Sequence, residues 1–315
     1  MAKKNEFVSV AMCIVLVVLL TVSSGVFWTT GNFDSLQAGI SPIAIISFGM
    51  MLLIICGYFD LSVSSVMLLA GVLAGQLTLM GVPIGLTIFY VLLTGLAAGS
   101  LNGFLVSILG INPLIATIGT QYIGYGLAMT IWNSARALTK FPAAFIQIGE
   151  GKFLGLYYMT WIMLALLAFF IFFLRFTFKG RQLYFIGGNK EASKLVGIKD
   201  RRALFAAYAA TGLLAALAGV LAVARIQTPS QHMGSGVQMT CLIACVVGGG
   251  SFAGGKGTAV GALFGVVFMT LLTNMFTLLE MNVQLQNVVV GLILIAVIVL
   301  DGYLNIKKMR EIGKI

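Results

Sequence analysis

Asp60 is the residue whose chemistry is least expected from its surroundings, because it lies in the apolar stretch CGYFDLSVSS. It is the only charged residue between Asp34 and Arg136. A carboxylate in such a setting can relay protons, bind a substrate or cap a helix. Because Leu-Ser-Val follows it and no second carboxylate is near in sequence, the pattern favours an N-cap that accepts from the amides of Ser62 or Val63. A proton relay is the alternative.

The segment GSFAGGKG, from Gly250 to Gly257, approaches the phosphate-binding pattern G-x-x-x-x-G-K-[ST]. Gly257 stands where Ser or Thr must bind magnesium, and no strand pattern precedes the segment. We therefore expect an interfacial turn with Lys256 at the membrane surface. Without a Walker A motif or a catalytic constellation the chain is not expected to be an enzyme, so energy must come from another subunit or an ion gradient.

Metal and redox chemistry are not indicated either. His232 is the only histidine, and no acidic residue lies near it in sequence, so we expect a solvated side chain. The cysteines form no C-x-x-C pair and are expected to be small buried apolar residues. They are Cys13, Cys56, Cys241 and Cys245. No metal site and no cofactor is predicted for this chain.

The composition defines the elements that must position these residues. Of 315 residues, 60% are hydrophobic and 9% charged, and the mean hydropathy is +1.06. Soluble domains carry about 25% charged residues. The apolar runs are continuous rather than alternating, which favours membrane helices over a barrel. The fold class is therefore all-α integral membrane.

Ten segments are long and apolar enough to be candidate spans. They are 7–23, 39–57, 62–80, 84–107, 113–133, 158–176, 203–223, 237–253, 258–279 and 283–300. The first is interpreted as an uncleaved span, because no clear cleavage site follows it. The eighth is the weakest, since three glycines at 248–250 make it short or re-entrant. No linker separates soluble domains, so residues 1–315 are expected to form one membrane domain.

The distribution of Lys and Arg predicts the orientation. With the amino terminus inside, 15 basic residues fall on the cytoplasmic side and 4 outside. The outer four are Arg136, Lys140, Lys152 and Arg225. This asymmetry explains the net charge of +10 without any nucleic acid, and it places both termini in the cytoplasm. It also places Asp60 at the cytoplasmic boundary between the second and third spans.

The cytoplasmic loop 177–202 has the composition of an ordered segment. Asn189 suits an N-cap, Glu191 the first turn, Lys194 the last turn and Gly197 a left-handed stop, which predicts a helix of about two turns. One interpretation is a basic loop that anchors to anionic lipid. The other is a helix that seats in a groove of a partner protein.

Four stretches resemble one family. Residues 60–63, D-L-S-V, are similar to its G-G-I-D-L-S-V-G-S signature. Residues 187–198 are similar to its G-G-N…A-A…G-I loop, and residues 247–257 to its L-G-G-T-S-x-x-G-G-[KR]-G segment. Residues 112–117 add N-P-L-I-A-T, similar to P-F-I-A-T. On these motifs the chain resembles the permease subunits of bacterial ABC importers, in the ribose-type branch that handles monosaccharides and related solutes.

The resemblance implies an architecture with inverted repeats in the bacterial plasma (inner) membrane. It implies two permease subunits around one pathway, identical or paralogous, an ABC ATPase subunit that binds ATP and Mg, and a soluble solute-binding protein outside. It assigns ATPase coupling to Gly188, Asn189, Glu191, Ala192, Gly197 and Ile198. Tyr58, Ser64 and Ser193 depart from the family pattern, since they replace two glycines and an alanine. The bulk of Tyr58 puts a close backbone approach at that turn in question.

The polar residues in or beside the spans are neutral, which argues against ionic substrates. They are Asn102, Asn112, Thr117, Gln121, Asn133, Gln238, Thr240, Asn274, Gln286 and Asn287. Of these, Asn102, Asn112, Thr117, Gln121 and Asn274 are the candidates for the translocation path. Each can instead form an interhelical hydrogen bond, worth about 0.6 kcal/mol. We expect import of a monosaccharide or similar small polar solute; the alternatives are an ion-coupled secondary transporter and a permease of the same family for nucleosides or another solute.

Two runs of glycine at four-residue spacing predict helix faces that permit close backbone approach. They are Gly95, Gly99 and Gly103, and Gly257, Gly261 and Gly265. The contact is either within the chain or across a dimer, and the spacing does not distinguish the two.

Overall fold

The computed structural model describes residues 2–134, 141–195, 197–228 and 233–311. Arg136, Lys140 and His232, which entered the predictions above, lie outside these residues. The helices are α1 (Ala2–Ser23), α2 (Thr30–Ile55), α3 (Val63–Leu79), α4 (Ile84–Gly103), α5 (Pro113–Ser134), α6 (Ala143–Glu150), α7 (Tyr158–Phe176), α8 (Phe178–Gly188), α9 (Lys190–Leu195), α10 (Asp200–Ile226), α11 (Val237–Val247), α12 (Ala259–Leu278) and α13 (Val283–Glu311). A π-helical turn, η1 (Phe104–Ile108), extends α4, and two short strands are β1 (Lys152–Phe153) and β2 (Leu156–Tyr157).

Each of the ten predicted spans coincides with a helix. Seven helices of the described chain are long and apolar enough to cross a membrane, and three apolar helices are shorter: 8–23 within α1, α3 and α11. With 11 residues, α11 is about 16 Å long, roughly half the hydrocarbon thickness. The prediction that the eighth span is short is therefore correct. Its cause is the glycine turn that ends α11 at Gly248.

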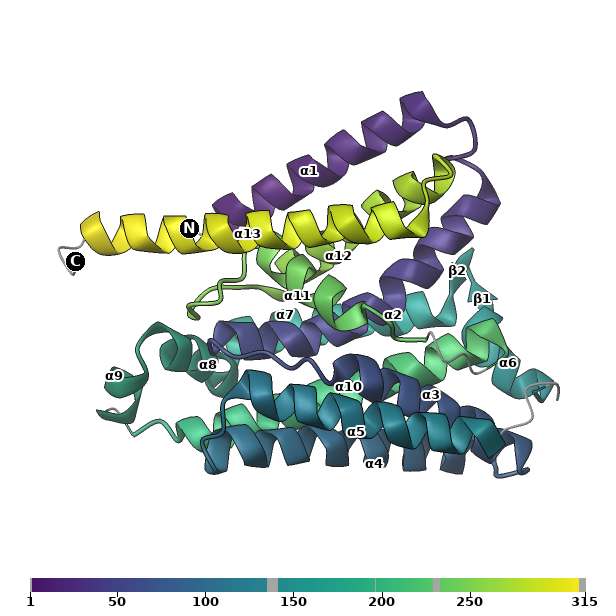
Figure 1. The fold of residues 1–315 in the computed structure, drawn as a ribbon, viewed down its shortest axis with the longest axis horizontal. Coiled ribbons are helices and arrows are strands. Elements are labelled where there is room, and N and C mark those ends of the chain that lie inside the picture. The colour runs from purple at the N-terminus through teal and green to yellow at the C-terminus, as the bar shows by residue number, and fades with distance from the viewer. Residues whose placement is uncertain (1, 135–140, 196, 229–232, 312–315) are drawn as a thin grey trace.

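The centre of the bundle is formed by α2 and α10, whose apolar windows are 78% and 72% buried. In Figure 1, α4 and α5 cover one side of this pair, and α1 and α13 lie at the opposite edge. The apolar windows of α4, α5 and α13 are 22%, 17% and 0% buried, so these helices present apolar surface to lipid or to a partner. This arrangement, with a buried central helix pair and apolar outer helices, is typical of an all-α membrane protein, as predicted.

The glycine faces make their contacts within the chain. In α4, a Cβ added at Gly95 would lie 2.5 Å from the carbonyl oxygen of Gly212, and one at Gly99 would meet the carbonyl oxygen of Tyr208 in α10. In the second run, Gly261 and Gly265 of α12 lie against the backbone of α11. The question that the spacing left open is thus answered by intramolecular helix pairs.

The two ends of the molecule carry different structures. In Figure 1, α8 and α9 lie on the left, at the same end of the molecule as the last residues of α13. The helix α6 and the β1–β2 hairpin lie at the opposite end. There, Lys152 pairs with Asp34 at 2.6 Å and Arg225 pairs with Glu150 at 3.2 Å. Two of the basic residues predicted to lie outside are therefore at the end opposite α8 and α9. The hairpin and α6 were not predicted, because their residues were assigned to a polar loop.

Candidate translocation and coupling site

The junction between α2 and α3 is an irregular segment inside the bundle. Gly57, with φ of 80°, turns the chain after α2, and helical structure resumes only at Val63. Asp60, in the middle of this segment, is completely buried. Its Oδ1 accepts from the backbone N–H of Ser62 at 2.8 Å and from Ser62 Oγ at 2.7 Å. Asp60 therefore forms a turn with the residue two positions on and precedes the N-cap position itself, which Ser62 occupies without a side-chain cap bond.

Asp60 lies inside the helix bundle rather than on its surface. Tyr208, whose hydroxyl donates to the carbonyl of Phe59 at 2.9 Å, lies eight residues into α10, about 12 Å from the start of that helix. The placement of Asp60 at the cytoplasmic boundary stays a prediction. The irregular segment agrees with the predicted break at residues 58–61, between the second and third spans.

Asn102 of α4 completes the surroundings of Asp60. Its Nδ2 lies 3.3 Å from each carboxylate oxygen of Asp60 and donates to Ser62 Oγ at 2.7 Å. Its Oδ1 accepts from Thr120 Oγ1 of α5 at 2.7 Å. Next to it, Gln121 Nε2 donates to Ser64 Oγ at 3.3 Å. This polar network joins α3, α4 and α5, and its hydrogen bonds to Asp60 come from neutral donors, which favours a structural carboxylate over a relay.

A cavity of about 440 Å³ adjoins the network between α3, α5 and the segment that precedes α11. Its polar lining consists of Ser64, Ser65, Gln121, Tyr122, Tyr125, Ser235 and Gln238. The lining contains no charged side chain among the described residues. Gln238 Oε1 is buried and has no hydrogen-bond partner in the part of the chain that the structure describes. The neutral donors and acceptors of the lining suit a ligand that carries hydroxyl groups.

The predicted path residues are distributed over several places. Gln121 lines the cavity, while Asn102 and Thr117 are fully buried behind it. Asn112 caps α5 by accepting from Leu114 N at 2.9 Å. Asn274 donates to Asn32 at 2.7 Å, between α12 and α2, away from the cavity. Of these five side chains, only that of Gln121 faces the cavity.

Tyr122 and Tyr125 are cavity residues that the sequence reasoning missed. Both are exposed, with 75% and 47% of their surface accessible. The available signal was polarity at positions 121, 122 and 125 of one apolar helix. Tyrosine in a span was not counted as polar, although its hydroxyl both donates and accepts hydrogen bonds.

The predicted coupling helix is present and has the predicted ends. Asn189 Oδ1 accepts from Ala192 N at 3.0 Å, so Asn189 caps α9. Gly197 has φ of 77°, the left-handed stop, and Ile198 N bonds Ser193 O at 3.1 Å beyond it. Glu191 and Ala192 are exposed on this helix. The prediction did not include α8, an 11-residue helix that precedes the cap.

The segment formed by α8 and α9, residues 178–195, packs directly on the α2–α3 junction. Gly187 lies against the carbonyl oxygen of Ile55, which also accepts from Gly255 N at 2.7 Å. Lys190 Nζ donates to the hydroxyl of Tyr58 at 2.8 Å, two residues before Asp60. The close backbone approach is thus made by Gly187 and Gly255 against Ile55. The side chain of Tyr58 does not block it and instead contacts Lys190.

Helices long enough to span a membrane, an uncharged polar cavity and an exposed capped helix at one end define the chain as a membrane transport permease. The chain belongs to the family described as branched-chain amino acid transport system / permease component, which it matches over residues 32–298. The resemblance found in the sequence is thereby confirmed.

Individual relatives fall in the same class. The chain is 31% identical to the ribose import permease protein RbsC of Haemophilus influenzae, over 94% of this chain and 93% of that protein. It is 32% identical to the probable ABC transporter permease protein y4mJ of Sinorhizobium fredii, over 94% and 89%. It is 31% identical to the autoinducer 2 import system permease protein LsrC of Escherichia coli, over 86% and 79%. No solved structure matches the chain.

Proposed function

We propose that this chain is the permease subunit of an ATP-driven importer that moves a monosaccharide or similar small, uncharged polar solute into the bacterial cytoplasm. The cavity beside the Asp60–Asn102 network is the observation that carries the proposal. Serine, glutamine and tyrosine side chains line it, and hydroxyl groups of a solute can exchange hydrogen bonds with them. The names of two relatives, ribose import and autoinducer 2 import, are in line with a small solute.

We also infer three partners. An ABC ATPase subunit, with its ATP and Mg, docks on α9, where Glu191, Ala192 and Leu195 are exposed, the last at 89%. A second permease, identical or paralogous, covers α5, where Ile115 and Tyr122 are exposed at 68% and 75% beside the cavity. A solute-binding protein delivers solute at the end that carries the β1–β2 hairpin. Both termini are cytoplasmic in this proposal.

The contacts suggest how docking at α9 changes the cavity. A displacement of α9 acts on Tyr58 through Lys190, and a displacement of α8 acts on Ile55 through Gly187. Tyr58 lies in the irregular junction and Ile55 is the last residue of α2, so both contacts act where the regular helix ends and the chain is able to change conformation. Asp60 and Ser62 transmit the change to the network that borders the cavity.

Uptake in vesicles tests the proposal against the secondary transporter. The chain is reconstituted with the ATPase encoded nearest to it, ATP is placed on the side of α9, and ionophores collapse the ion gradients. Labelled ribose uptake should require ATP and survive the ionophores, and excess nucleoside should not compete. Proton-driven uptake by the chain alone contradicts the proposal, while competition by nucleoside supports the nucleoside alternative.

Pull-down of the ATPase tests the docking site separately. Replacing Glu191 with Arg, or Gly197 with Val, should weaken the association, because the first reverses an exposed charge and the second strains a left-handed turn. Gly31→Ala is the matched control for added volume, since nothing lies within 4 Å of a Cβ at Gly31 and this residue lies in the first turn of α2, at the end opposite α9. Unchanged association of the Glu191 and Gly197 variants contradicts coupling through α9.

A further inference from the structure

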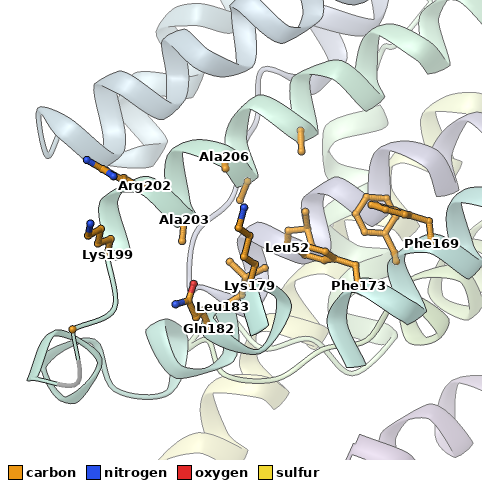
Figure 2. Close-up of a pocket in the computed structure, with 14 residues that line it drawn as sticks. Leu52, Phe169, Phe173, Lys179, Gln182, Leu183, Lys199, Arg202, Ala203 and Ala206 are labelled. Carbon is orange, nitrogen blue, oxygen red and sulfur yellow. The ribbon is translucent and has the colours of Figure 1, made fainter. Parts of the chain in front are cut away.

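A second cavity, of about 690 Å³, lies between α7, α8 and α10 and has no role in the proposed function (Figure 2). Its apolar lining consists of Leu52, Phe169, Phe170, Phe173, Leu183, Ala203, Ala206, Ala207 and Ala210. Its basic lining consists of Lys179, Lys199 and Arg202. The cavity therefore combines the two chemistries of an amphipathic ligand.

These two chemistries are separated in space. Figure 2 shows Phe169 and Phe173 at one end, Lys199 and Arg202 at the other, and Lys179 between them. The apolar end lies between α7 and α10, two helices long enough to span a membrane. The basic end lies where these helices meet the segment formed by α8 and α9. A ligand that fills the cavity is thus apolar along the bundle and anionic at its end.

The electrostatics of the basic end favour an anion. Within the described chain, none of the three basic side chains forms an ion pair. Asp200, the carboxylate nearest in sequence, accepts from Arg201 N at 2.8 Å and lines a different cavity. Lys179 and Arg202 also occupy the first turns of α8 and α10, where the helix dipole disfavours cations. An anion bound between these basic side chains would pair with their charges and interact favourably with the amino-terminal ends of both helices.

We propose that this cavity binds one anionic phospholipid, with its phosphate among Lys179, Lys199 and Arg202 and an acyl chain between Phe169 and the alanine face of α10. Basic pockets between membrane helices on the cytoplasmic side recognise lipid head groups in this way. The volume is within the range of ligand sites, about 300–1,000 Å³. An acidic surface of a partner protein matches only the basic end and leaves the aromatic end unfilled.

Lipid retention tests the proposal without reference to the transported solute. The full chain, with any subunit that it retains, is purified from nanodiscs of phosphatidylcholine with one-fifth phosphatidylglycerol, and bound lipid is measured by mass spectrometry. Lys179→Gln with Arg202→Gln removes two charges of the basic end. Arg181→Gln with Arg201→Gln removes two charges from the same helices outside the cavity lining. Ala206→Phe fills the apolar part and leaves every charge in place.

The ratio of bound phosphatidylglycerol to bound phosphatidylcholine, relative to the same ratio in the nanodisc, should fall about 30-fold in the Lys179/Arg202 variant, since each basic residue near a membrane surface contributes about fivefold. It should also fall in Ala206→Phe and remain in the Arg181/Arg201 control. Equal loss in the control overturns the proposal in favour of general positive charge. Unchanged enrichment in both test variants also overturns the proposal. The proposal is overturned as well if bound phosphatidylglycerol is unchanged while the ATPase or the second permease is lost. Gel filtration of each variant confirms that it is folded.

Discussion

Exchange of the carboxylate and amide between positions 60 and 102 is the sharpest test of whether Asp60 is structural. In Asp60→Asn, one side-chain oxygen can still accept from the N–H and Oγ of Ser62. The new amide then faces Asn102 Nδ2, which lies 3.3 Å from both oxygens of Asp60. Rotating the Asn102 amide relieves this donor–donor contact but breaks its 2.7 Å bond from Thr120. We expect a loss of about 1–3 kcal/mol in the free energy of unfolding.

The reverse substitution should be worse. Asn102→Asp places a second buried carboxylate beside Asp60 and removes the donor to Ser62 Oγ, so a loss of about 3–5 kcal/mol is expected. The double variant Asp60→Asn with Asn102→Asp restores one carboxylate and one amide, and the carboxylate then at position 102 can accept from Thr120. The double variant should therefore be more stable than Asn102→Asp, with a coupling free energy of about 1–3 kcal/mol.

Thermal unfolding in detergent and ATP-driven uptake together decide the matter. A structural role predicts that Asp60→Asn, measured below its unfolding temperature, retains most of its uptake. Normal stability with abolished uptake refutes a purely structural role; a proton relay is then supported only if uptake also fails to respond to ATP-dependent docking at α9, which separates it from lost transmission through Asp60. The reasoning is also refuted if the stability loss of the double variant equals the sum of the losses of the two single variants. In that case the two side chains do not interact as described.

Single contacts elsewhere in the bundle give three more predictions. Gly99→Val should lower stability by about 1–3 kcal/mol through overpacking against α10. Gly126→Ala, where nothing lies within 4 Å of the added Cβ, should raise stability by at most about 1 kcal/mol. Thermal unfolding measures both changes. Tyr58→Phe should lower stability by no more than about 1 kcal/mol, since it removes only the exposed bond from Lys190, and a larger loss in the same assay contradicts this account. Gln238→Leu should keep or raise stability by removing an unsatisfied buried acceptor, yet raise the KM for uptake; a stability loss or an unchanged KM contradicts its assignment to the cavity.

Local sequence signals predicted the helical elements well. Continuous apolar runs indicated all ten membrane segments, because helix formation in a membrane requires only that each segment satisfy its own backbone hydrogen bonds. The Asn189 cap and the Gly197 stop were equally local, since each depends on residues within one turn. The missed elements, α6, α8 and the hairpin, are too short to span a membrane, and hydropathy does not distinguish such segments from loops.

The candidate sites depended on contacts between distant residues. Asn102 was correctly counted as polar, but only the packing of α4 on the α2–α3 junction shows that it binds Asp60, 42 residues away. The cavity beside Gln121 needs Gln238, which belongs to a segment on the other half of the chain.

The sequence by itself determined that this is an all-α membrane protein with a capped helix in a basic loop, because hydropathy and capping act through neighbouring residues. That it is a permease followed from the resemblance of its motifs to those of one family. Tertiary structure alone decided that Asp60 is buried in a network of neutral donors, that the glycines of α4 contact α10, and that Lys179 and Arg202 border one amphipathic cavity. The physical reason is that side-chain hydrogen bonds, close backbone contacts and cavities form between helices. Local sequence patterns do not show which helices become neighbours.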